Sequence, residues 1–333
     1  MAEPRFLVVR LGSLGDIVHT FPAVAALRES FPRAEIIWIT HPRWEFLVER
    51  SGLASLIRTV ETRSWDSLRE VLGFIRARGW DAAIDYQGLW KSAGMPFLGG
   101  VKRRIGFSRE TIREYGVPVL YTERVRTTSK HVADQNGELS LRAGAKQSVA
   151  PVALRVRDED AAEVAGILQK QGIEHYVLLS PGGGWRSKCW PAERFGALCD
   201  KLGNELKLRC VVNYGPGEEN LTKEIVQNAG KFEPFCFTGN LGQLMALLKN
   251  ASCLVAGDTG PLHLGVALRI PAVALFGPTD PQRNGPYHSN DIVLRSPAAV
   301  TSYKRGEQPD VSMLQLAVED VARAVRKRIV GKK

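Results

Sequence analysis

Short apolar runs alternate with helical patterns along most of this 333-residue chain, and this alternation limits its fold more than any other feature. Strand-like runs occupy residues 6–11, 35–40, 81–86, 175–180, 208–213, 253–256 and 272–276. Helical patterns occupy residues 17–31, 45–51, 191–202, 218–229, 241–248 and 311–329. Repeated strand–helix units produce parallel sheets that are covered by helices on both faces. The sequence therefore predicts an α/β protein with doubly wound sheets.

The length of the chain and a change in its composition predict two main domains. A single hydrophobic core is usually outgrown beyond about 250–300 residues, and the alternation restarts after an irregular stretch at residues 147–157. The predicted boundaries are 1–155 for an N-terminal domain and 156–310 for a C-terminal domain. Residues 311–333 are predicted to form a basic amphipathic helix, for which packing against the N-terminal domain is one option.

Positive charge exceeds negative charge, with 45 Lys and Arg residues against 35 Asp and Glu residues and a net charge of +10. This excess favours an anionic partner such as a nucleotide, a phosphorylated sugar or an anionic membrane surface. A nucleic-acid partner is not expected, because no recognition module accompanies the charge. Residues 91–130 hold nine Lys and Arg residues against three Glu. We interpret this block as a surface for an acidic acceptor, with a solvated face as the alternative. Residues 312–333 are also basic, which suits contact with an anionic bilayer.

The cysteines and the apolar segments predict a soluble, cytoplasmic protein. The five cysteines are an odd number without a Cys-x-x-Cys pair, which fits a reducing compartment better than a disulfide framework or a zinc site. The N-terminus lacks the pattern of a signal peptide, and no apolar run approaches the length of about 18–20 residues that crosses a bilayer. Asp158 and Asp160 match an Asp-x-Asp metal motif, but they open a helical pattern, where acidic residues favour the helix dipole. We therefore expect no metal site.

A glycine-containing loop with the sequence RLGSLGD follows the first predicted strand at residues 10–16. In open α/β sheets, ligands bind at the carboxyl ends of the strands, where this loop lies. It lacks the Gly-x-Gly-x-x-Gly fingerprint, and residues 40–42 offer no acid for a ribose, so an NAD-dependent oxidoreductase is a disfavoured alternative. Asp16 stands at the start of a helix. It is either an N-cap or a general base, and its spacing alone favours the cap.

The sequence SPGGGWRSKCWP at residues 180–191 places three glycines and two cations just before a predicted helix. Free backbone amides, the helix dipole and a cation can all act on one anion there. Gly183, Gly184 and Lys188 therefore form a candidate phosphate cradle, with a solvated lysine and core tryptophans as the alternative interpretation. The segment is not a Walker A loop, because the Gly-Lys-Ser/Thr order is absent.

The sequence GDTGPLH at residues 257–263 forms a second turn of this kind between a strand and a helix. The Thr259 hydroxyl and the amides of Thr259 and Gly260 can reach phosphate oxygens. Asp258 can accept hydrogen bonds from sugar hydroxyls, and His263 falls in the first helical turn, where it can face the same ligand. The alternatives are a capping role for Asp258 and a structural role for His263.

These segments resemble glycosyltransferase family 9, the bacterial lipopolysaccharide heptosyltransferases. The matching stretches follow the order of the family along nearly the whole chain: VVRLGSLGDIVHTFPA (8–23), DYQGLWKSA (85–93), SKCWP (187–191), GPGEE (215–219), DTGPLHL (258–264) and LFGPTDPQRNGPY (275–287). Each motif is weak alone, and the ordered set is specific. The resemblance implies the GT-B architecture, in which two Rossmann-like domains face a cleft, with the acceptor on the N-terminal side and the nucleotide-sugar on the C-terminal side.

The resemblance also implies a role for each candidate residue. The catalytic base would be Asp16, and the acceptor would be bound by Lys91 and Arg113. The groups for the donor would be Lys188, Gly183, Gly184, Thr259 and Gly260 for the phosphates, Asp258 for the heptose hydroxyls, Glu218 (or Glu219, one residue on) for the ribose, and His263 in the wall of the donor pocket.

The implied reaction transfers L-glycero-D-manno-heptose from ADP-heptose to the Kdo-bearing inner core of lipopolysaccharide. It inverts the anomeric carbon and needs neither a metal nor another cofactor. The implied place is the cytoplasm, with peripheral contact with the inner membrane. Another sugar or nucleotide donor is the alternative on this scaffold. Two departures bear on donor and acceptor identity: Gly183 and Gly184 stand where the family offers hydroxylated residues, and residues 303–309 lack its cysteine-rich segment.

Overall fold

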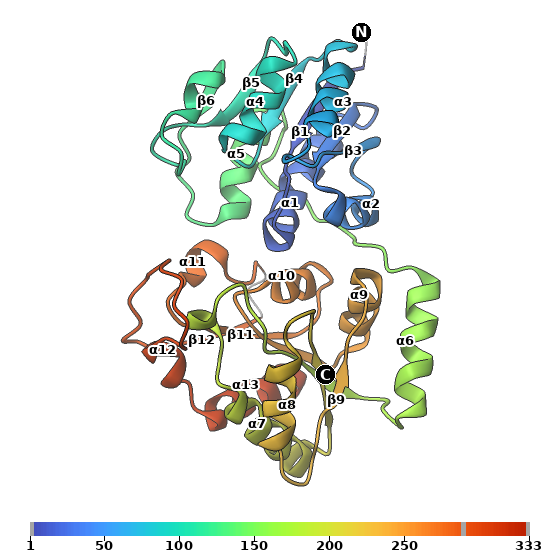
Figure 1. The fold of residues 1–333 in the computed structure, drawn as a ribbon, viewed down its shortest axis with the longest axis vertical. Coiled ribbons are helices and arrows are strands. Elements are labelled where there is room, and N and C mark those ends of the chain that lie inside the picture. The colour runs from blue at the N-terminus through green and yellow to red at the C-terminus, as the bar shows by residue number, and fades with distance from the viewer. Residues whose placement is uncertain (1–2, 288–290, 331–333) are drawn as a thin grey trace. The chain divides into compact units, whose positions relative to one another are not determined.

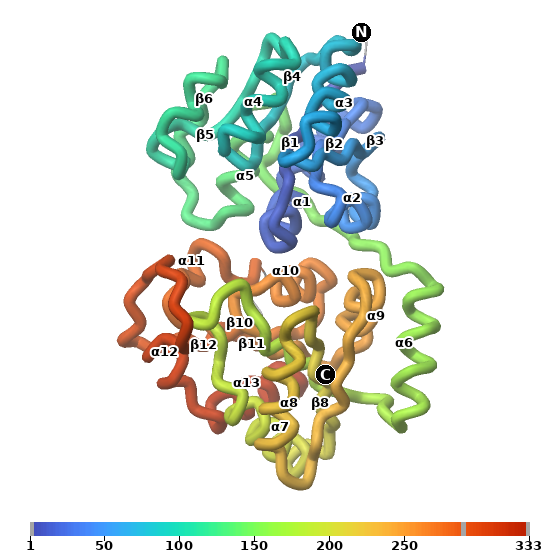
Figure 2. The backbone as a smooth tube through the Cα atoms, viewed as in Figure 1, coloured from blue at the N-terminus to red at the C-terminus, as the bar shows by residue number. Residues whose placement is uncertain are grey.

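The computed structural model describes residues 3–287 and 291–330. The chain forms two compact units, of which the first ends at Arg155 and the second begins at Val156 (Figure 1). Residues 144–157 run between them without a helix or strand. The amide of Ala150 donates to the carbonyl of Pro22, and the amide of Arg155 donates to that of Arg50, so this connection is fixed along the first unit (Figure 2).

The first unit contains a sheet of six parallel strands in the order β3-β2-β1-β4-β5-β6. The strands are β1 (Arg5–Val9), β2 (Glu35–Thr40), β3 (Leu56–Thr59), β4 (Ala82–Asp85), β5 (Arg104–Phe107) and β6 (Glu123–Val125). β1, β2 and β4 are buried along nearly their whole length, as expected for parallel strands between two helical layers. In register, Leu7 lies beside Ile37 of β2 and Ala83 of β4.

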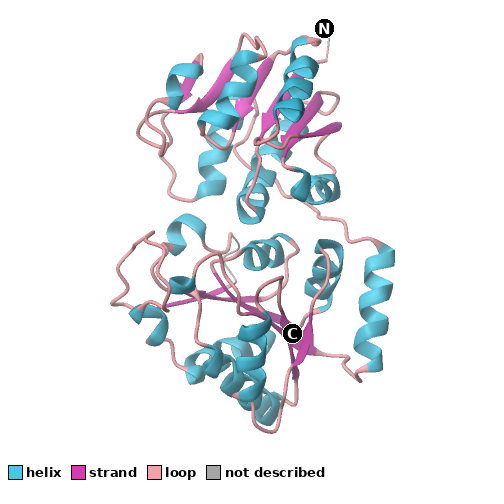
Figure 3. Ribbon diagram, viewed as in Figure 1, coloured by secondary structure: helices cyan, strands magenta, loops and turns pink. Residues whose placement is uncertain are grey.

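Helices cover both faces of this sheet (Figure 3). They are α1 (Leu14–Ser30), the 3-10 helix η1 (Pro42–Trp44), α2 (Glu45–Ser51), α3 (Trp65–Arg76), α4 (Trp90–Leu98), the 3-10 helix η2 (Val117–Leu120) and α5 (Val132–Ala143). On one face, Ile75 of α3 and Met95 of α4 join a core cluster with Leu7. On the other, α1 packs along α5, and Phe21 of α1 contacts Trp38 of β2.

The second unit repeats this plan with six parallel strands in the order β12-β11-β10-β7-β8-β9. The strands are β7 (Tyr176–Ser180), β8 (Arg209–Asn213), β9 (Phe235–Phe237), β10 (Cys253–Gly257), β11 (Ala272–Phe276) and β12 (Ile292–Arg295). In both sheets the first strand of the unit pairs with its fourth, β1 with β4 and β7 with β10. The winding reverses there, and ligands of such folds bind outside the carboxyl ends of these strands. The predicted α/β class with two doubly wound sheets is confirmed.

The helices of the second unit also form two layers. They are α6 (Asp158–Lys170), the 3-10 helix η3 (Arg186–Lys188), α7 (Ala192–Leu206), α8 (Glu219–Gln227), α9 (Leu241–Asn250), α10 (Gly260–Ala267), α11 (Pro281–Asn284), α12 (Val311–Leu314) and α13 (Val318–Val330). α9 packs against both α6 and α10. α7 and α13 pack against each other and contribute to one hydrophobic core cluster of this unit. Within the described part of the chain, none of the helices combines the length and the apolar character needed to cross a bilayer.

The C-terminal segment differs from its prediction as one helix. It forms two helices, α12 and α13, and the carbonyl of Leu316 between them accepts a hydrogen bond from Nε1 of Trp190 (3.0 Å). α13 belongs to the core of the second unit. Val321 and Val325, one turn apart, are fully buried there against β11 and α7. Residues 331–333 of the predicted segment lie outside the described residues.

Candidate active site

Asp16 lies in the first turn of α1, directly after the loop that follows β1. Its Oδ2 accepts hydrogen bonds from the amide (2.9 Å) and the hydroxyl (3.1 Å) of Ser13. Its Oδ1 lies 2.8 Å from Nη2 of Arg10, yet 45% of the side chain stays exposed. Asp16 therefore caps the helix and also keeps an accessible carboxylate, so the two interpretations of this residue are compatible.

Arg10 holds the Asp16 carboxylate in place, a role that the sequence pattern did not predict. The Arg10 side chain is buried, and its Nη1 donates to the carbonyl of Tyr86 in the loop after β4. The same two loops are joined a second time, because the amide of Leu11 donates to Oε1 of Gln87 (2.7 Å). Guanidinium donors have fixed directions, so these contacts orient Asp16 relative to the end of β4.

Asp85, the last residue of β4, organises that neighbouring loop. Its Oδ1 accepts hydrogen bonds from the amides of Gln87 (2.9 Å) and Gly88 (3.2 Å). Its Oδ2 accepts from the hydroxyls of Ser92 (2.9 Å) and Tyr121 (2.7 Å). Burial raises the pKa of Asp85, and the four hydrogen bonds oppose this shift without cancelling it. A buried carboxylate with four donors fixes the loop from residue 85 to residue 92, which in turn supports the Asp16 loop.

Lys91 and Arg113, the candidate acceptor residues, are both exposed and lie on segments that touch. Lys91 is in the first turn of α4, and Arg113 precedes η2. The amide of Trp90 donates to Oε2 of Glu114 (2.7 Å), and the Trp90 ring packs directly against Gly116. The structure therefore places the two cations on adjoining segments of the first unit.

Other cations of the basic block at residues 91–130 stabilise the fold. Nε of Arg103 lies 2.6 Å from Oε1 of Glu123. Nε of Arg104 (2.7 Å) and Nε of Arg124 (2.9 Å) donate to backbone carbonyls of η2. The density of charge in this block is therefore only partly available to an acceptor.

In the second unit, Gly183, Lys188 and Thr259 lie together at the carboxyl ends of β7 and β10. A Cβ atom at Gly183 would come within 3.5 Å of Cγ2 of Thr259 and 3.7 Å of Cε of Lys188. Lys188 is buried, with Nζ 4.2 Å from the centre of the Trp185 ring, and it donates to the carbonyl of Asp258. It is not a solvated surface lysine. Because an ammonium group has three donors, it can bind an anion in addition to this carbonyl.

The N-terminus of α10 adds backbone donors to this group. Thr259 is the N-cap of α10, and Gly260 is its first residue. The first amides of a helix have no partner within it, and they carry the positive end of the helix dipole. They can therefore bind an anion beside Lys188. Gly184 is exposed, and a Cβ atom there would meet nothing within 4 Å, so packing does not tie it to the group.

Asp258 and His263 form a buried pair next to Lys188. Nε2 of His263 lies 3.1 Å from Oδ1 of Asp258, and Nζ of Lys188 lies 3.9 Å from its Oδ2. Burial by itself raises the pKa of Asp258, but the hydrogen bond and charge of His263 and the charge of Lys188 outweigh it, and the pKa is lowered. Asp258 is thus an ionised carboxylate that orients both neighbours.

Glu218 approaches the glycine-rich loop, whereas Glu219 does not. Oε2 of Glu218 accepts from the amide of Gly215 (2.8 Å), and a Cβ atom at Gly182 would overlap the Glu218 carboxylate. Only glycine at position 182 permits this approach. Glu219 is exposed and accepts from the amide of Gly217 (3.2 Å). An acid after the second strand of a Rossmann fold is well placed for a ribose. Glu218 follows β8, the second strand of this unit, and is the better candidate.

Residues 302–310 support the glycine-rich loop, a contact that no motif predicted. The amide of Ser187 donates to the carbonyl of Gly306 (3.3 Å), and the amide of Asp310 donates to the carbonyl of Ser187 (3.0 Å). Arg305 stacks on Trp185, with Cζ 5.5 Å from the ring centre. Ser187 and Gly306 are 119 positions apart, so no local pattern reveals the contact.

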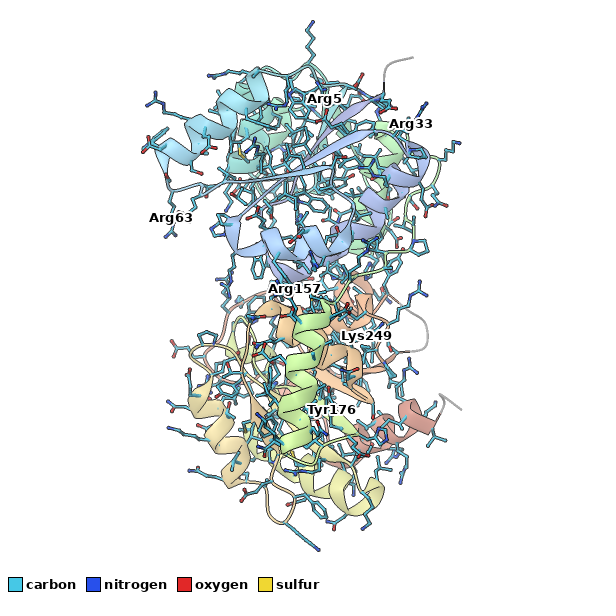
Figure 4. All side chains as sticks on the ribbon, turned by 90° about the vertical axis from the view of Figure 1, so that its right-hand side faces the viewer. Arg5, Arg33, Arg63, Arg157, Tyr176 and Lys249 are labelled. Atoms are coloured by element: carbon cyan, nitrogen blue, oxygen red, sulfur yellow. The ribbon has the colours of Figure 1, made fainter. Side chains whose placement is uncertain are left out.

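Asp158 and Asp160, the Asp-x-Asp pair, lie in the first turn of α6, as the dipole interpretation predicts. Oδ2 of Asp160 lies 2.7 Å from Nε of Arg157. Arg157 stands at the beginning of this helix (Figure 4). The Asp160 carboxylate also packs against Gly242 of α9. Among the described residues, no three His, Cys, Asp or Glu side chains are grouped so that they could hold a metal ion.

Solved structures share this fold. A family 9 glycosyl transferase from Veillonella parvula superposes with a TM-score of 0.85 and 22% identity, covering 99% of each chain. The E. coli heptosyltransferase WaaC with ADP gives a TM-score of 0.74 at 23% identity and covers 97% of each chain. The same protein with ADP-2-deoxy-2-fluoro heptose gives 0.73 at 23% identity and covers 97% of this chain and 99% of that one.

Sequence comparison adds the family. Lipopolysaccharide heptosyltransferase 1 of Escherichia coli strain K12 is 28% identical over 320 residues, covering 88% of this chain and 94% of that protein. The sequence model of glycosyltransferase family 9 (heptosyltransferase) matches residues 69–312, which hold the glycine-rich loop and the turn at Asp258. Because this match spans well over half of the sequence, the chain belongs to glycosyltransferase family 9, the heptosyltransferases.

Proposed function

We propose that the protein is an inverting, metal-independent enzyme that transfers L-glycero-D-manno-heptose from ADP-heptose to the Kdo-bearing inner core of lipopolysaccharide. The observation that carries the proposal is the group of Gly183, Lys188 and Thr259 at the carboxyl ends of β7 and β10, which offers a cation and backbone amides to a diphosphate. The names of the relatives support it, since similar proteins are lipopolysaccharide heptosyltransferases and similar structures were solved with ADP and an ADP-heptose analogue.

In the proposed reaction, Asp16 accepts the proton of an acceptor hydroxyl. The hydroxyl oxygen bonds to the anomeric carbon of the heptose from the side opposite to ADP. The bond between that carbon and the phosphate oxygen breaks, ADP leaves with the electron pair, and the configuration is inverted. The proton then passes from Asp16 to water.

Negative charge develops on the departing ADP, and residues of the second unit stabilise it. Lys188 and the amides of Gly183, Gly184, Thr259 and Gly260 would act on the phosphates. These donors provide the charge stabilisation that a divalent cation supplies in metal-dependent transferases, which supports metal independence.

The remaining candidates would bind the sugars. Asp258, ionised and held by His263, would accept hydrogen bonds from heptose hydroxyls in a pocket that His263 lines, and Glu218 would accept from the ribose. Lys91 and Arg113 would pair with the acidic groups of the acceptor. The second class of function, an NAD-dependent oxidoreductase, is not favoured, because the family is one of transferases.

Turnover with ADP-heptose and a Kdo-bearing lipid A acceptor tests this proposal. We expect ADP release and an acceptor that gains one heptose by mass spectrometry, at the same rate with and without EDTA. UDP- and GDP-linked sugars serve as donor controls. Transfer from one of these controls but not from ADP-heptose would contradict the donor assignment. Activity that EDTA abolishes and a divalent cation restores would contradict metal independence.

Glu218→Gln should raise the Kd for ADP by about tenfold, because a hydrogen bond from ribose to a charged acceptor is replaced by one to a neutral amide. Glu219→Gln is the matched control and should leave the Kd unchanged. Calorimetry with ADP, 2′-deoxy-ADP and 3′-deoxy-ADP checks both variants. The effect of Glu218→Gln on the Kd should shrink for the analogue that lacks the hydroxyl bound by Glu218. An effect of Glu219→Gln larger than that of Glu218→Gln would reverse the assignment.

A further inference from the structure

The solvent-exposed face of α4 carries large apolar side chains. Trp90, Phe97 and Leu98 are 50%, 46% and 55% exposed. The opposite face of the helix is buried and consists of Ser92, Ala93, Met95 and Pro96. Positions 90, 97 and 98 fall on one side of a helix with about 3.6 residues per turn. A surface helix normally presents polar residues on its solvent-exposed side. The exposed side of α4 is instead apolar, and no described residue covers it.

The segment around η2 extends this apolar surface. Tyr115 and Val119 are 70% and 65% exposed. Arg104 links the two segments, because its guanidinium Cζ lies 5.3 Å from the centre of the Phe97 ring and its Nε donates to a carbonyl of η2. The Trp90 ring also packs against the backbone beside Tyr115. We call Trp90, Phe97, Leu98, Tyr115 and Val119 the α4–η2 patch.

Exposed cations border the α4–η2 patch. They are Lys91, Lys102, Arg109 and Arg113. The Cζ atom of Arg109 lies 5.6 Å from the centre of the Tyr115 ring. Residues 90–120 contain six Lys and Arg residues against two Glu, so this surface is positive. Contiguous exposed apolar side chains mark a binding surface. Trp and Tyr favour the membrane–water interface, and Lys and Arg are attracted to anionic lipids.

The C-terminal basic helix, the other surface considered for a bilayer, fits less well. Three arginines of α13 form ion pairs: Arg323 with Asp320, Arg326 with Glu205, and Arg328 with Asp291. These acids reduce the positive charge that α13 presents, and its apolar side is used in the core of the second unit. The described part of α13 therefore pairs its arginines with acids and lacks the exposed aromatic residues that the α4–η2 patch has.

We propose that the α4–η2 patch lies on an anionic lipid bilayer and holds the enzyme at the surface that contains its acceptor. This inference rests on the proposed function, in which the acceptor is a membrane-anchored lipid, and it adds the surface that contacts the bilayer. Lys91 and Arg113 border the patch. Docking therefore brings both cations to the level of the lipid headgroups, where the acidic sugars of such an acceptor lie.

Co-sedimentation with vesicles tests the docking surface. The patch variant combines Phe97→Ser, Leu98→Ser, Tyr115→Ser and Val119→Ser, all at positions that are at least 46% exposed, so the fold does not depend on them. The control variant combines Val300→Ser and Val311→Ser, which are 79% and 68% exposed on the second unit. Thermal melting checks that both variants fold.

Wild type and control should bind vesicles that contain phosphatidylglycerol, and binding should weaken as salt screens the cations. Vesicles of phosphatidylcholine alone should bind them less. The patch variant should bind at least about tenfold more weakly, because buried apolar area drives insertion. Equal binding by the patch variant and wild type would overturn the inference. So would a wild-type dimer that the patch variant converts to a monomer, because the patch would then be a subunit interface.

Turnover separates this inference from the proposed function. The patch variant should match wild type on a deacylated, water-soluble acceptor and lose most of its activity on the same acceptor embedded in vesicles. Equal activity of both proteins on the embedded acceptor would overturn the docking surface and leave the reaction intact. Vesicle binding that depends on the patch, together with no heptose transfer to any acceptor, would support the surface and refute the proposed reaction.

Discussion

Asp16→Asn should lower kcat for heptose transfer by about 10²–10⁴-fold, which is the usual contribution of a general base. The amide of asparagine cannot take the proton of the acceptor hydroxyl. Its oxygen can still accept a hydrogen bond from Ser13, so the start of α1 should persist. ADP would bind to residues of the second unit, and its Kd should therefore stay within about twofold of the wild-type value. Steady-state kinetics and calorimetry measure the two quantities.

A matched control for this variant is Asp66→Asn. Asp66 is an exposed acid in the first turn of α3, so its replacement changes the same kind of helix terminus in the same unit. The control should retain wild-type kcat. If Asp16→Asn turns over at a rate close to that of the control, Asp16 is not the base. If both variants lose activity together with thermal stability, the effect of Asp16→Asn is structural and the assignment also fails.

Lys188→Ala should raise the Kd for ADP by about 10- to 150-fold, since hydrogen bonds to charged groups contribute about 1.5–3 kcal/mol. Lys188 is buried against Trp185 and donates to the carbonyl of Asp258, so water replaces its ammonium group poorly. Lys188→Arg keeps the positive charge but replaces the compact ammonium group with a larger, planar guanidinium. This variant should therefore recover only part of the affinity for ADP.

Adenosine separates a phosphate contact from general damage to the second unit. It lacks the diphosphate, so its Kd should be the same for Lys188→Ala and wild type. Lys304→Ala, at an exposed lysine of the segment next to the loop, is the positional control and should bind ADP normally. Unchanged ADP affinity in Lys188→Ala would remove this residue from the phosphate site. A parallel loss of adenosine binding would show that the variant disturbs the fold.

Central strands were easier to predict from the sequence than edge strands. β2 and β11 coincide with their predicted ranges, because a strand buried on both faces is a continuous apolar run. The edge strands β3, β6, β9 and β12 have only three or four residues and were not predicted, and neither was the short strand β5 beside β6. β6 has the sequence Glu-Arg-Val, which does not resemble a buried strand. It is a strand because it pairs with β5. Such strands depend on partners that are distant in the sequence.

Some parts of the candidate site could likewise be predicted from the sequence and others could not. The loops with Asp16, Lys188 and Thr259 were predictable because glycines and polar residues follow apolar strands in each case. The residues that hold these loops were not. Arg10 acts through a hydrogen bond to Tyr86, 76 positions away, and Asp85 is reached by Tyr121, 36 positions away. Composition and spacing describe what a loop offers, and only the folded chain decides which other segment holds it.

The connectivity of the two units sets the order in which the candidate loops of each unit can be completed during synthesis. The first unit is a continuous stretch that ends at Arg155, so it can fold while later residues are still being added. The second unit needs its last helix, because Val321 and Val325 fill its core, and Ser187 needs Gly306 as a partner. A nascent chain released before residue 302 would therefore have a complete Asp16 loop and a glycine-rich loop that lacks its partners from residues 302–310. The Asp16 loop can therefore reach its final structure while the chain is still being made, whereas the loop that holds Lys188 is complete only once the C-terminal helices have been synthesised.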